Sequence, residues 1–315
     1  MKSKLLPAGL LLAAAALIFG SSLQRIPPAP RPPQAAPVPP AVYPAIRTAI
    51  PGYQDYAGVV AQLREWQEQS AGWAETGTYG QSTRGQDLAY IAVHQPQTSG
   101  PAVLVTGCIH GNEPLATSTV MAFLGTMLAT AQDRDVAEIL GTRTMYFVPV
   151  VSPDSYPSSR EVDGVDPNRD FPGPHAPKKK SVKPLAALQD FFQAKRPKAA
   201  LSGHTFGRVF LIPWGDRNEP CPNAADYDRL TKDMVQLSDG YKPIRGCQMY
   251  SRPIMGTEVD WYYRHGALAM VWEFGTHQRK PSMQDVQDEF RRTYKAFLYF
   301  CKEAPKIQIA PMGAE

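Results

Sequence analysis

The sequence predicts an α/β protein, a three-layer α/β/α sandwich with a mixed, mostly parallel central sheet. Strand-like and helix-like patterns alternate along most of the 315 residues, which is the order that βαβ units produce. Residues 102–105 and 268–271 form continuous apolar runs, typical of strands that helices cover on both faces. Apolar residues make up 43% of the chain, enough for a substantial core.

Each element follows from its own pattern, in chain order. The helical spacing of Val59, Leu63 and Trp66 predicts a first helix over 56–69. Strands are predicted at 87–94, 102–107, 144–150, 198–202, 209–213 and 267–273, and further helices at 114–130, 184–195, 225–238 and 284–301. In sheets of this class the functional site forms at the C-terminal ends of the strands, so we expect the chemistry there.

The first 51 residues are unlike the rest of the chain. Two lysines, Lys2 and Lys4, precede an apolar run over 5–19, which is typical of an export signal and short for a membrane span. We therefore predict that 1–25 is a signal peptide or an N-terminal membrane anchor, which places the body in the periplasm or outside the cell. The Pro/Ala-rich segment 26–51 favours extended polyproline II and predicts a disordered linker.

Charge and cysteine content exclude some classes of function. Charged residues make up 20% of the chain, the net charge is +4, and no long basic stretch is interleaved with aromatics, so we expect no nucleic-acid partner. The absence of C-x-x-C excludes a cysteine-based zinc knuckle. Cys221 and Cys247 could pair in an oxidising compartment, although four cysteines allow three connectivities. Cys108 is expected to be a buried apolar residue.

Candidate metal ligands follow two predicted strands. His110 and Glu113 lie where a strand ends and a helix begins, and Gly111 between them permits an unusual backbone angle. His204 follows another short strand. Zinc in hydrolases commonly takes two histidines and one carboxylate, with a position left for water. The other histidines are expected not to be ligands: His94, His175, His265 and His277.

Two further motifs carry groups suited to substrate chemistry. Asn168 and Arg169 lie side by side in a polar turn, and the planar Arg fork suits a carboxylate; the alternative is a surface pair with Asp170. Glu273 ends an apolar strand. Burial raises a carboxyl pKa while a nearby zinc favours ionisation, so Glu273 could shuttle a proton, unless it pairs with a neighbouring Arg or Lys.

The order of these motifs resembles the zinc metallocarboxypeptidase family, the group typified by carboxypeptidase A. H-x-x-E, D-x-N-R, a lone histidine, D-W-x-Y and a strand ending in Glu follow one another over about 55–300. The resemblance implies a catalytic domain over 52–303, a tail at 304–315, and one Zn²⁺ per chain bound by His110, Glu113 and His204. It implies that Glu273 is the general base and acid, and that Asp166 orients the first histidine ligand.

The resemblance also implies substrate contacts. Asn168 and Arg169 match the pair that binds the terminal carboxylate of the substrate. Arg160 is the candidate for the arginine that stabilises the oxyanion. The segment between Arg160 and the Asn168–Arg169 pair is much shorter than in the digestive enzymes of the family. Tyr250 is the nearest match to the mobile substrate-binding tyrosine, two residues further from D-W-x-Y than expected. Val259 falls near the position that sets side-chain preference, and its apolar side chain suggests an uncharged terminal residue.

The expected function is that of an exported, monomeric zinc carboxypeptidase that releases the C-terminal residue of a peptide. A peptidoglycan stem peptide is an alternative substrate, cleaved by carboxypeptidase action or at a γ-D-glutamyl–diamino acid bond, since both substrate classes present a carboxylate. An aspartoacylase-like deacylase is a second alternative, because such enzymes also carry His-Gly-Asn-Glu. A catalytically inactive peptide-binding module is the third.

Overall fold

The computed structural model describes residues 50–174, 181–277 and 280–312. The predicted signal or anchor at 1–25, most of the linker and His175 lie outside these residues. The strands are β1 Ala74–Gln81, β2 Asp87–Val93, β3 Ala102–Gly107, β4 Thr144–Val148, β5 Ala199–Thr205, β6 Val209–Ile212, β7 Lys242–Arg245 and β8 Leu268–Phe274. The helices are α1 Tyr56–Gln69, α2 Pro114–Ala129, α3 Arg134–Thr142, α4 Lys183–Lys195, α5 Ala224–Gln236, α6 Gly246–Met249, α7 Glu258–Arg264 and α8 Met283–Glu303, with 3-10 turns η1 Pro167–Arg169 and η2 Ala304–Lys306.

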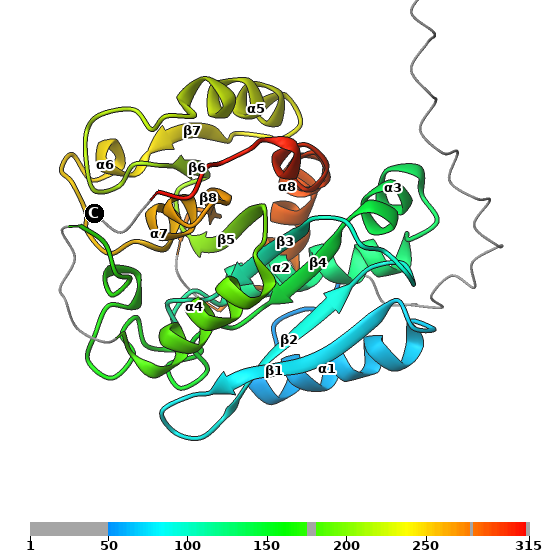
Figure 1. Ribbon diagram of the computed structural model, residues 1–315. Coiled ribbons are helices and arrows are strands. Elements are labelled where there is room, and N and C mark those ends of the chain that lie inside the picture. The colour runs from blue at the N-terminus through cyan, green and yellow to red at the C-terminus, as the bar shows by residue number, and fades with distance from the viewer. Residues whose placement is uncertain (1–49, 175–180, 278–279, 313–315) are drawn as a thin grey trace, which may run out of the picture. The chain divides into compact units, whose positions relative to one another are not determined.

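The strands form one eight-stranded sheet in the order β1-β2-β4-β3-β5-β8-β6-β7 (Figure 1). The pairs β3–β4, β3–β5, β5–β8 and β6–β7 are parallel. The pairs β1–β2, β2–β4 and β6–β8 are antiparallel. The predicted mixed, mostly parallel sheet is therefore confirmed.

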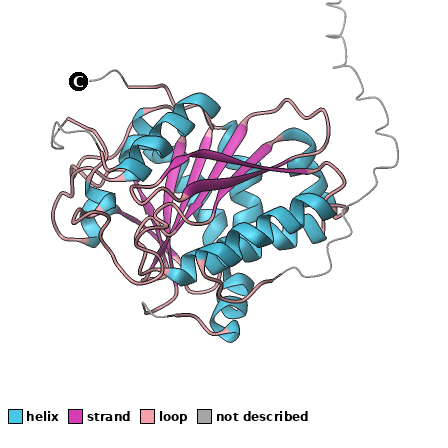
Figure 2. Cartoon of the chain, turned by 90° about the horizontal axis from the view of Figure 1, so that it is seen from below, coloured by secondary structure: helices cyan, strands magenta, loops and turns pink. Residues whose placement is uncertain are grey.

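Helices cover both faces of the sheet, as Figure 2 shows around the magenta strands. On one face, Phe123 of α2 stacks on Phe297 of α8 with ring centroids 4.3 Å apart and meets Trp272 of β8 edge-on at 6.4 Å. On the other face, Phe192 of α4 stacks on Tyr262 of α7 at 4.8 Å. Because successive strand residues point to opposite faces, Glu273 is directed away from the aromatic layer that holds Trp272.

The register of the parallel strands positions the site. Gly107 of β3 lies opposite Gly203 of β5, and His204 of β5 lies opposite Glu273 of β8. The C-terminal ends of β3, β5 and β8 therefore meet at one edge of the sheet, as expected for functional residues in this fold class. His110 follows β3 by three residues, so the chain brings it to the same edge.

The predicted elements all occur, with ends shifted by a few residues, but the sequence did not predict β1, β7, α3, α6 or α7. The strands β1 and β7 are at the two edges of the sheet. Only Ala74 is buried in β1 and no residue is buried in β7, so neither shows the apolar alternation of a half-buried strand. In α7 every residue but Arg264 is buried, which removes the polar face that identifies a helix.

Two smaller points complete the fold. All four cysteines are buried, free thiols, so the Cys221–Cys247 pair considered above is not formed, while Cys108 is buried as predicted. Within the described ranges no single helix has both the length and the apolar composition of a membrane span; α2 and α3 meet that test only as a pair bent by 98°.

Candidate active site

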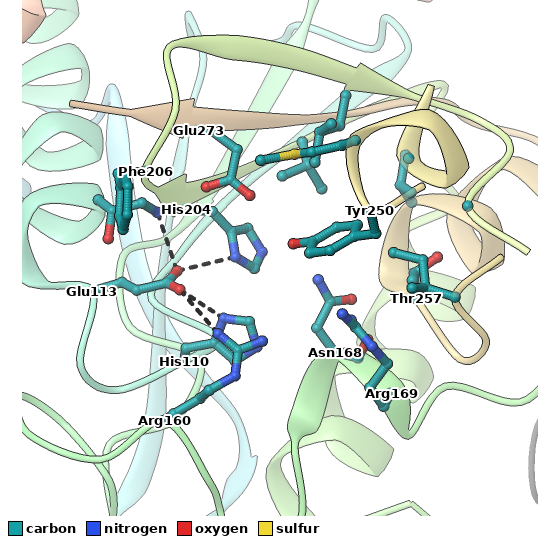
Figure 3. Close-up of a pocket in the computed structure, with 18 residues that line it drawn as sticks. His110, Glu113, Arg160, Asn168, Arg169, His204, Phe206, Tyr250, Thr257 and Glu273 are labelled. Atoms are coloured by element: carbon teal, nitrogen blue, oxygen red, sulfur yellow. Dashed lines mark hydrogen bonds and ion pairs between the residues drawn. The ribbon is translucent and has the colours of Figure 1, made fainter. Parts of the chain in front are cut away.

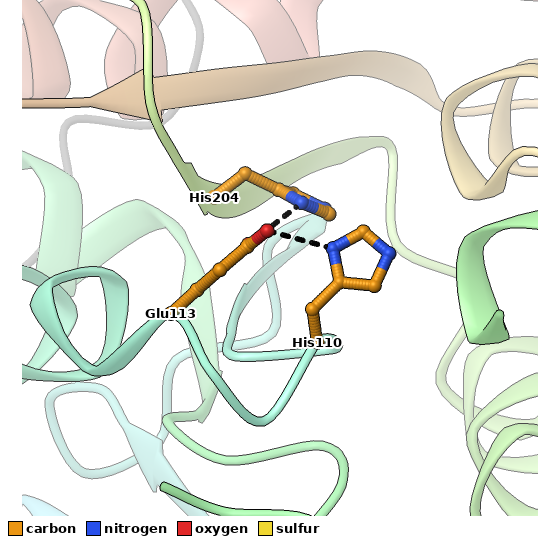
Figure 4. A group of neighbouring side chains, drawn as sticks. All are labelled: His110, Glu113 and His204. Carbon is orange, nitrogen blue, oxygen red and sulfur yellow. Dashed lines mark hydrogen bonds and ion pairs between the residues drawn. The ribbon is translucent and has the colours of Figure 1, made fainter. Parts of the chain in front are cut away.

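Three side chains from two segments, the β3–α2 loop and the end of β5, converge and form what we call the metal-ligand cluster: His110, Glu113 and His204 (Figure 4). One potential ligand atom from each lies within 4.8 Å of the others, and all three residues are buried. The Nδ1 atoms of His110 and His204 lie 2.8 and 3.0 Å from the two Glu113 carboxylate oxygens. Two imidazoles and one carboxylate are the donor set that catalytic zinc prefers, so the cluster fits the predicted ion.

Each histidine of the metal-ligand cluster has a second carboxylate on its outer nitrogen. The Nε2 atom of His110 lies 3.0 Å from Asp166 Oδ1, which agrees with the predicted orienting role of Asp166. The Nε2 atom of His204 lies 2.5 Å from Glu258 Oε1. Sequence analysis did not identify Glu258. Its position directly before Val259 in the D-W-x-Y segment was the available signal.

The charges in the cluster shift its pKa values strongly. Burial opposes ionisation of Glu113, but the neighbouring His204 and His110 outweigh burial and lower the Glu113 pKa to about 2. Burial alone would lower the pKa of His204. The neighbouring Glu113 and Glu258 carboxylates outweigh burial and raise the His204 pKa well above its usual value. Both shifts have the same cause, which is the close contact of buried carboxylates with buried imidazoles.

Close packing explains the loop that carries His110 and Glu113. Cys108 adopts a left-handed φ of 51° directly after β3. A Cβ atom on Gly111 would lie 2.3 Å from the Ser155 carbonyl oxygen, so a side chain cannot fit. The φ of Gly111 lies outside the left-handed region. The prediction of an unusual backbone angle at Gly111 is therefore wrong, and close approach of the Ser155 backbone explains the glycine instead.

Glu273 lines the same cavity as the metal-ligand cluster, with only 5% of the residue exposed. Figure 3 shows its carboxylate directed into the cavity on the side of His204. Burial raises the pKa of Glu273 to about 7 although the nearby His204 opposes the shift. Among the described residues no Arg or Lys forms an ion pair with Glu273, which disfavours the alternative of a structural acid.

The turn η1 presents Asn168 and Arg169 opposite the metal-ligand cluster. Asp166 caps the turn by accepting a hydrogen bond from the Asn168 backbone N–H at 3.0 Å. The Asn168 Oδ1 atom accepts from the Glu258 backbone N–H at 2.9 Å, which leaves the amide nitrogen as the group for an incoming ligand. The Arg169 guanidinium lies 5.5 Å from the centre of the Tyr250 ring. This side of the cavity therefore offers N–H donors.

Arg160, Tyr250 and Val259 complete the predicted set. The Arg160 guanidinium donates to Asp166 Oδ2 at 2.9 and 3.1 Å and lies 3.7 Å from Glu113 Oε1. Tyr250 is 41% exposed at the end of α6, whereas Val259 of α7 is 4% exposed. Every predicted site residue except Asp166 lines one cavity: His110, Glu113, Arg160, Asn168, Arg169, His204, Tyr250, Val259 and Glu273.

Sequence reasoning missed most of the cavity wall. The wall adds uncharged residues from β5, β6, β8, α6 and their loops: Thr205, Phe206, Leu211, Gly215, Gly246, Met249, Ile254, Thr257 and Val271. Single apolar residues in short loops give no pattern that marks a pocket. His94, His265 and His277 lie outside the metal-ligand cluster as expected; the His265 ring stacks on Trp261 at 3.9 Å.

An α/β sheet with two histidines and one glutamate at its strand ends is typical of a zinc-dependent hydrolase. The chain belongs to the zinc carboxypeptidase family, because that family's model, described as Zinc carboxypeptidase, matches residues 59–304. The predicted family resemblance and its zinc dependence are thereby confirmed.

Individual relatives agree with this membership. Rat Carboxypeptidase A2 is 23% identical over 207 residues, which cover 53% of this chain and 49% of the relative. The Metallocarboxypeptidase A-like protein of Trichophyton verrucosum is 23% identical over 261 residues, 68% of this chain and 60% of the relative. The chain thus spans about half the length of the curated relatives it matches.

Solved structures show the same fold. The crystal structure of thrombin activatable fibrinolysis inhibitor matches with a TM-score of 0.73 and 16% identity, over 81% of this chain and 75% of that one. Carboxypeptidase A from Helicoverpa armigera matches with a TM-score of 0.66 and 14% identity, over 80% and 73%. At these identities the likeness concerns the fold alone.

Proposed function

We propose that the chain is a zinc-dependent carboxypeptidase that hydrolyses the amide bond before the C-terminal residue of a peptide. One observation carries the proposal: a single cavity unites the metal-ligand cluster, the buried Glu273 and the Asn168–Arg169 pair. A carboxylate held by Arg169 would place the preceding amide bond between that pair and the cluster. This arrangement suits a substrate that ends in a free carboxylate.

The proposed chemistry divides between the metal and Glu273. His110, Glu113 and His204 would hold a zinc ion, which when bound would supply Lewis acidity toward a carbonyl and a water molecule. Glu273 accepts the proton of the attacking water and delivers it to the nitrogen of the leaving amine. Its burial and its freedom from ion pairs with described residues suit a group that exchanges a proton near neutral pH.

The remaining residues bind and orient the substrate. The Arg169 fork and the Asn168 amide nitrogen bind the terminal carboxylate through charge-assisted hydrogen bonds. The Arg160 guanidinium lies 3.7 Å from Glu113 Oε1 and would donate to the negative charge that develops on the reacting carbonyl oxygen. The half-exposed Tyr250 ring lies 5.5 Å from the Arg169 guanidinium and can contact the substrate beside it.

The cavity wall favours an uncharged terminal residue. Its side chains beside α6 and α7 are apolar or hydroxylated: Leu211, Met249, Ile254, Thr257, Val259 and Val271. Gly215 and Gly246 pack backbone against backbone in this wall, since a Cβ on Gly246 would lie 3.0 Å from the Gly215 Cα. A charged terminal residue would lose its hydration there without a partner.

Mass spectrometry of reaction products tests the proposal. The zinc-loaded full chain is incubated with L-peptides that end in a free carboxylate, with the same peptides amidated at the C-terminus, and with peptidoglycan stem peptides. Loss of single uncharged residues from the free peptides, and not from the amides, is expected. Glu273→Gln is the matched inactive control.

Other outcomes assign other functions. Cleavage confined to stem peptides would replace this proposal by a cell-wall peptidase or amidase. Hydrolysis of N-acyl amino acids alone would indicate a deacylase, and binding of zinc and peptide without turnover would indicate a binding module.

We also propose that the enzyme is exported, with 52–303 as its catalytic domain. The support is the apolar run at 5–19 after two lysines. Cell fractionation of the full chain, with N-terminal sequencing of the recovered protein, separates a cleaved signal from an uncleaved anchor. Recovery of the intact chain in the cytoplasm would refute export.

A further inference from the structure

We propose that Glu258 is a positioning residue that holds His204 for the metal with its side chain and Asn168 for the substrate with its backbone. The substrate half of this inference rests on the proposed carboxypeptidase function, whereas the metal half does not. Glu258 is the first residue of α7 and does not line the cavity. It therefore acts through the two residues that it contacts.

The side-chain contact fixes the His204 ring. Glu258 Oε1 lies 2.5 Å from His204 Nε2, and His204 Nδ1 lies 3.0 Å from Glu113 Oε2. A carboxylate that accepts the Nε2–H proton keeps the Nδ1 lone pair on the side of the metal-ligand cluster. Such a partner also raises the basicity of the ligand nitrogen, which strengthens metal binding.

The burial of Glu258 argues against an incidental contact. Glu258 has 0% exposure and His204 has 2%. The second oxygen, Oε2, has no hydrogen-bond partner among the described residues. A buried carboxylate with one free oxygen is destabilising for the fold unless a charged partner compensates it. The partner here is the buried His204 imidazole.

The backbone contact fixes Asn168. The Glu258 N–H donates to Asn168 Oδ1 at 2.9 Å. Because the amide oxygen is occupied, the Asn168 side chain can offer only its NH₂ group to the cavity. The donor is the main chain of Glu258, so a change of the Glu258 side chain leaves this contact in place. The two roles of Glu258 can therefore be separated by mutation.

Asp166 provides the same arrangement for the other histidine. Asp166 Oδ1 contacts His110 Nε2 at 3.0 Å and also accepts from the Asn168 N–H at 3.0 Å. Asn168 is thus held by both residues that orient the histidines of the metal-ligand cluster. The carboxylate-binding side of the cavity and the metal side share these supports, although no direct contact between Asn168 and the cluster is needed.

Zinc affinity of Glu258→Gln tests the inference. The full-length variant and the wild type are titrated with zinc in competition with a chromophoric chelator. Loss of the outer carboxylate of a metal-bound histidine weakens metal binding about 10- to 100-fold, and we expect a loss in that range. At saturating zinc the KM for a peptide substrate should remain within about twofold of wild type, because the Asn168 contact is preserved.

A spectroscopic measurement separates orientation from general damage. In zinc-loaded protein with ¹⁵N-labelled histidine, the Nε2–H proton of His204 should resonate far downfield and move upfield in Glu258→Gln. Glu289→Gln is the matched control, since Glu289 is also a buried acid (2% exposed) but bonds to the Tyr241 hydroxyl. The control should bind zinc as the wild type does.

Wild-type zinc affinity in Glu258→Gln, or an unchanged His204 proton, would overturn the inference. If Glu258→Gln fails to fold, Glu258→Met, which removes the carboxylate and keeps a side chain of similar length, provides the test through the same two measurements, and wild-type values there would equally overturn it. Failure of the proposed function is distinguishable, because zinc affinity and the His204 proton are measured without a peptide. If the wild type binds zinc but cleaves no peptide, the proposed function fails, while zinc affinity and the His204 proton still test the role of Glu258 in orienting His204.

Discussion

The two sides of the cavity are built differently. The metal side comes from strand ends and is buried: His110, Glu113 and His204 are 1–2% exposed. The side proposed to bind the substrate comes from η1 and the segment around α6, where Tyr250 is 41% exposed. Sheet register fixes the first side, and local hydrogen bonds fix the second. In the proposed function, the groups that need exact placement are therefore attached to the sheet, and the groups that need access for a substrate are attached to loops.

The supports of the substrate side are correspondingly local. Asp166 caps η1, and a Cβ on Gly256 would lie 2.4 Å from the Arg169 carbonyl oxygen. With a φ of 69° as well, Gly256 allows the loop before α7 to pass directly over Arg169. Changes on the metal side should therefore affect turnover, and changes on the substrate side should affect binding.

The largest effect is expected for Glu273→Gln. Removal of the proton-accepting carboxylate should lower kcat by about 10²- to 10⁴-fold, while zinc content stays at the wild-type level because Glu273 is not a ligand. Steady-state kinetics together with metal analysis measure both quantities. Retained turnover in this variant would show that another group is the base.

A smaller effect on kcat is expected for Arg160→Gln, because its guanidinium lies 3.7 Å from Glu113 of the metal-ligand cluster. Loss of one oxyanion donor lowers kcat by about 10²- to 10³-fold. Loss of the Asp166 contact should also weaken zinc binding slightly. A change in KM with kcat unaltered would instead assign Arg160 to the substrate side.

Arg169→Ala should act through binding. A hydrogen bond to a charged group contributes about 1.5–3 kcal/mol, so kcat/KM should fall about 10- to 100-fold, mainly through a higher KM. Arg169→Lys retains the charge without the planar fork and should recover part of the loss. An equal effect of Arg169→Ala on amidated and free peptides would exclude a carboxylate contact.

Val259→Ala should change selectivity alone. Removal of two methyl groups enlarges the apolar end of the cavity, and size differences of this kind alter the ratio of kcat/KM between substrates by about 10-fold or somewhat more. Competition between peptides that end in a small and a bulky apolar residue measures the shift, which should favour the bulky one. Unchanged selectivity would place the terminal side chain elsewhere.

The metal side was predictable from the sequence and the substrate wall was not. His110, Glu113, His204 and Glu273 each follow or end a recognisable apolar strand, and their order along the chain carries the family resemblance. The wall residues Met249 and Ile254 lie in short segments without periodicity. Their convergence depends on the tertiary packing of α6 and the loop after it, and a local sequence pattern does not predict that packing.

Glu258 shows the same limit inside a recognised motif. The family resemblance concerned Asp260 and Trp261, whereas the contact with His204 comes from the residue before Val259 and depends on the orientation of α7. Because α7 is buried on nearly all sides, its sequence lacks the polar face that would have revealed the helix. Neither the secondary structure nor the contacts of a short, fully buried helix can therefore be predicted from its local sequence pattern.

The most direct test of the central claim is the zinc dependence of peptide hydrolysis. The full chain is stripped with a chelator, assayed on L-peptides with a free carboxylate, and titrated back with Zn²⁺. The account predicts that hydrolysis disappears in the stripped protein and returns in proportion to zinc up to one ion per chain, with no recovery in His204→Ala at the same zinc concentrations. Hydrolysis that persists without zinc, or that returns equally in His204→Ala, would contradict it.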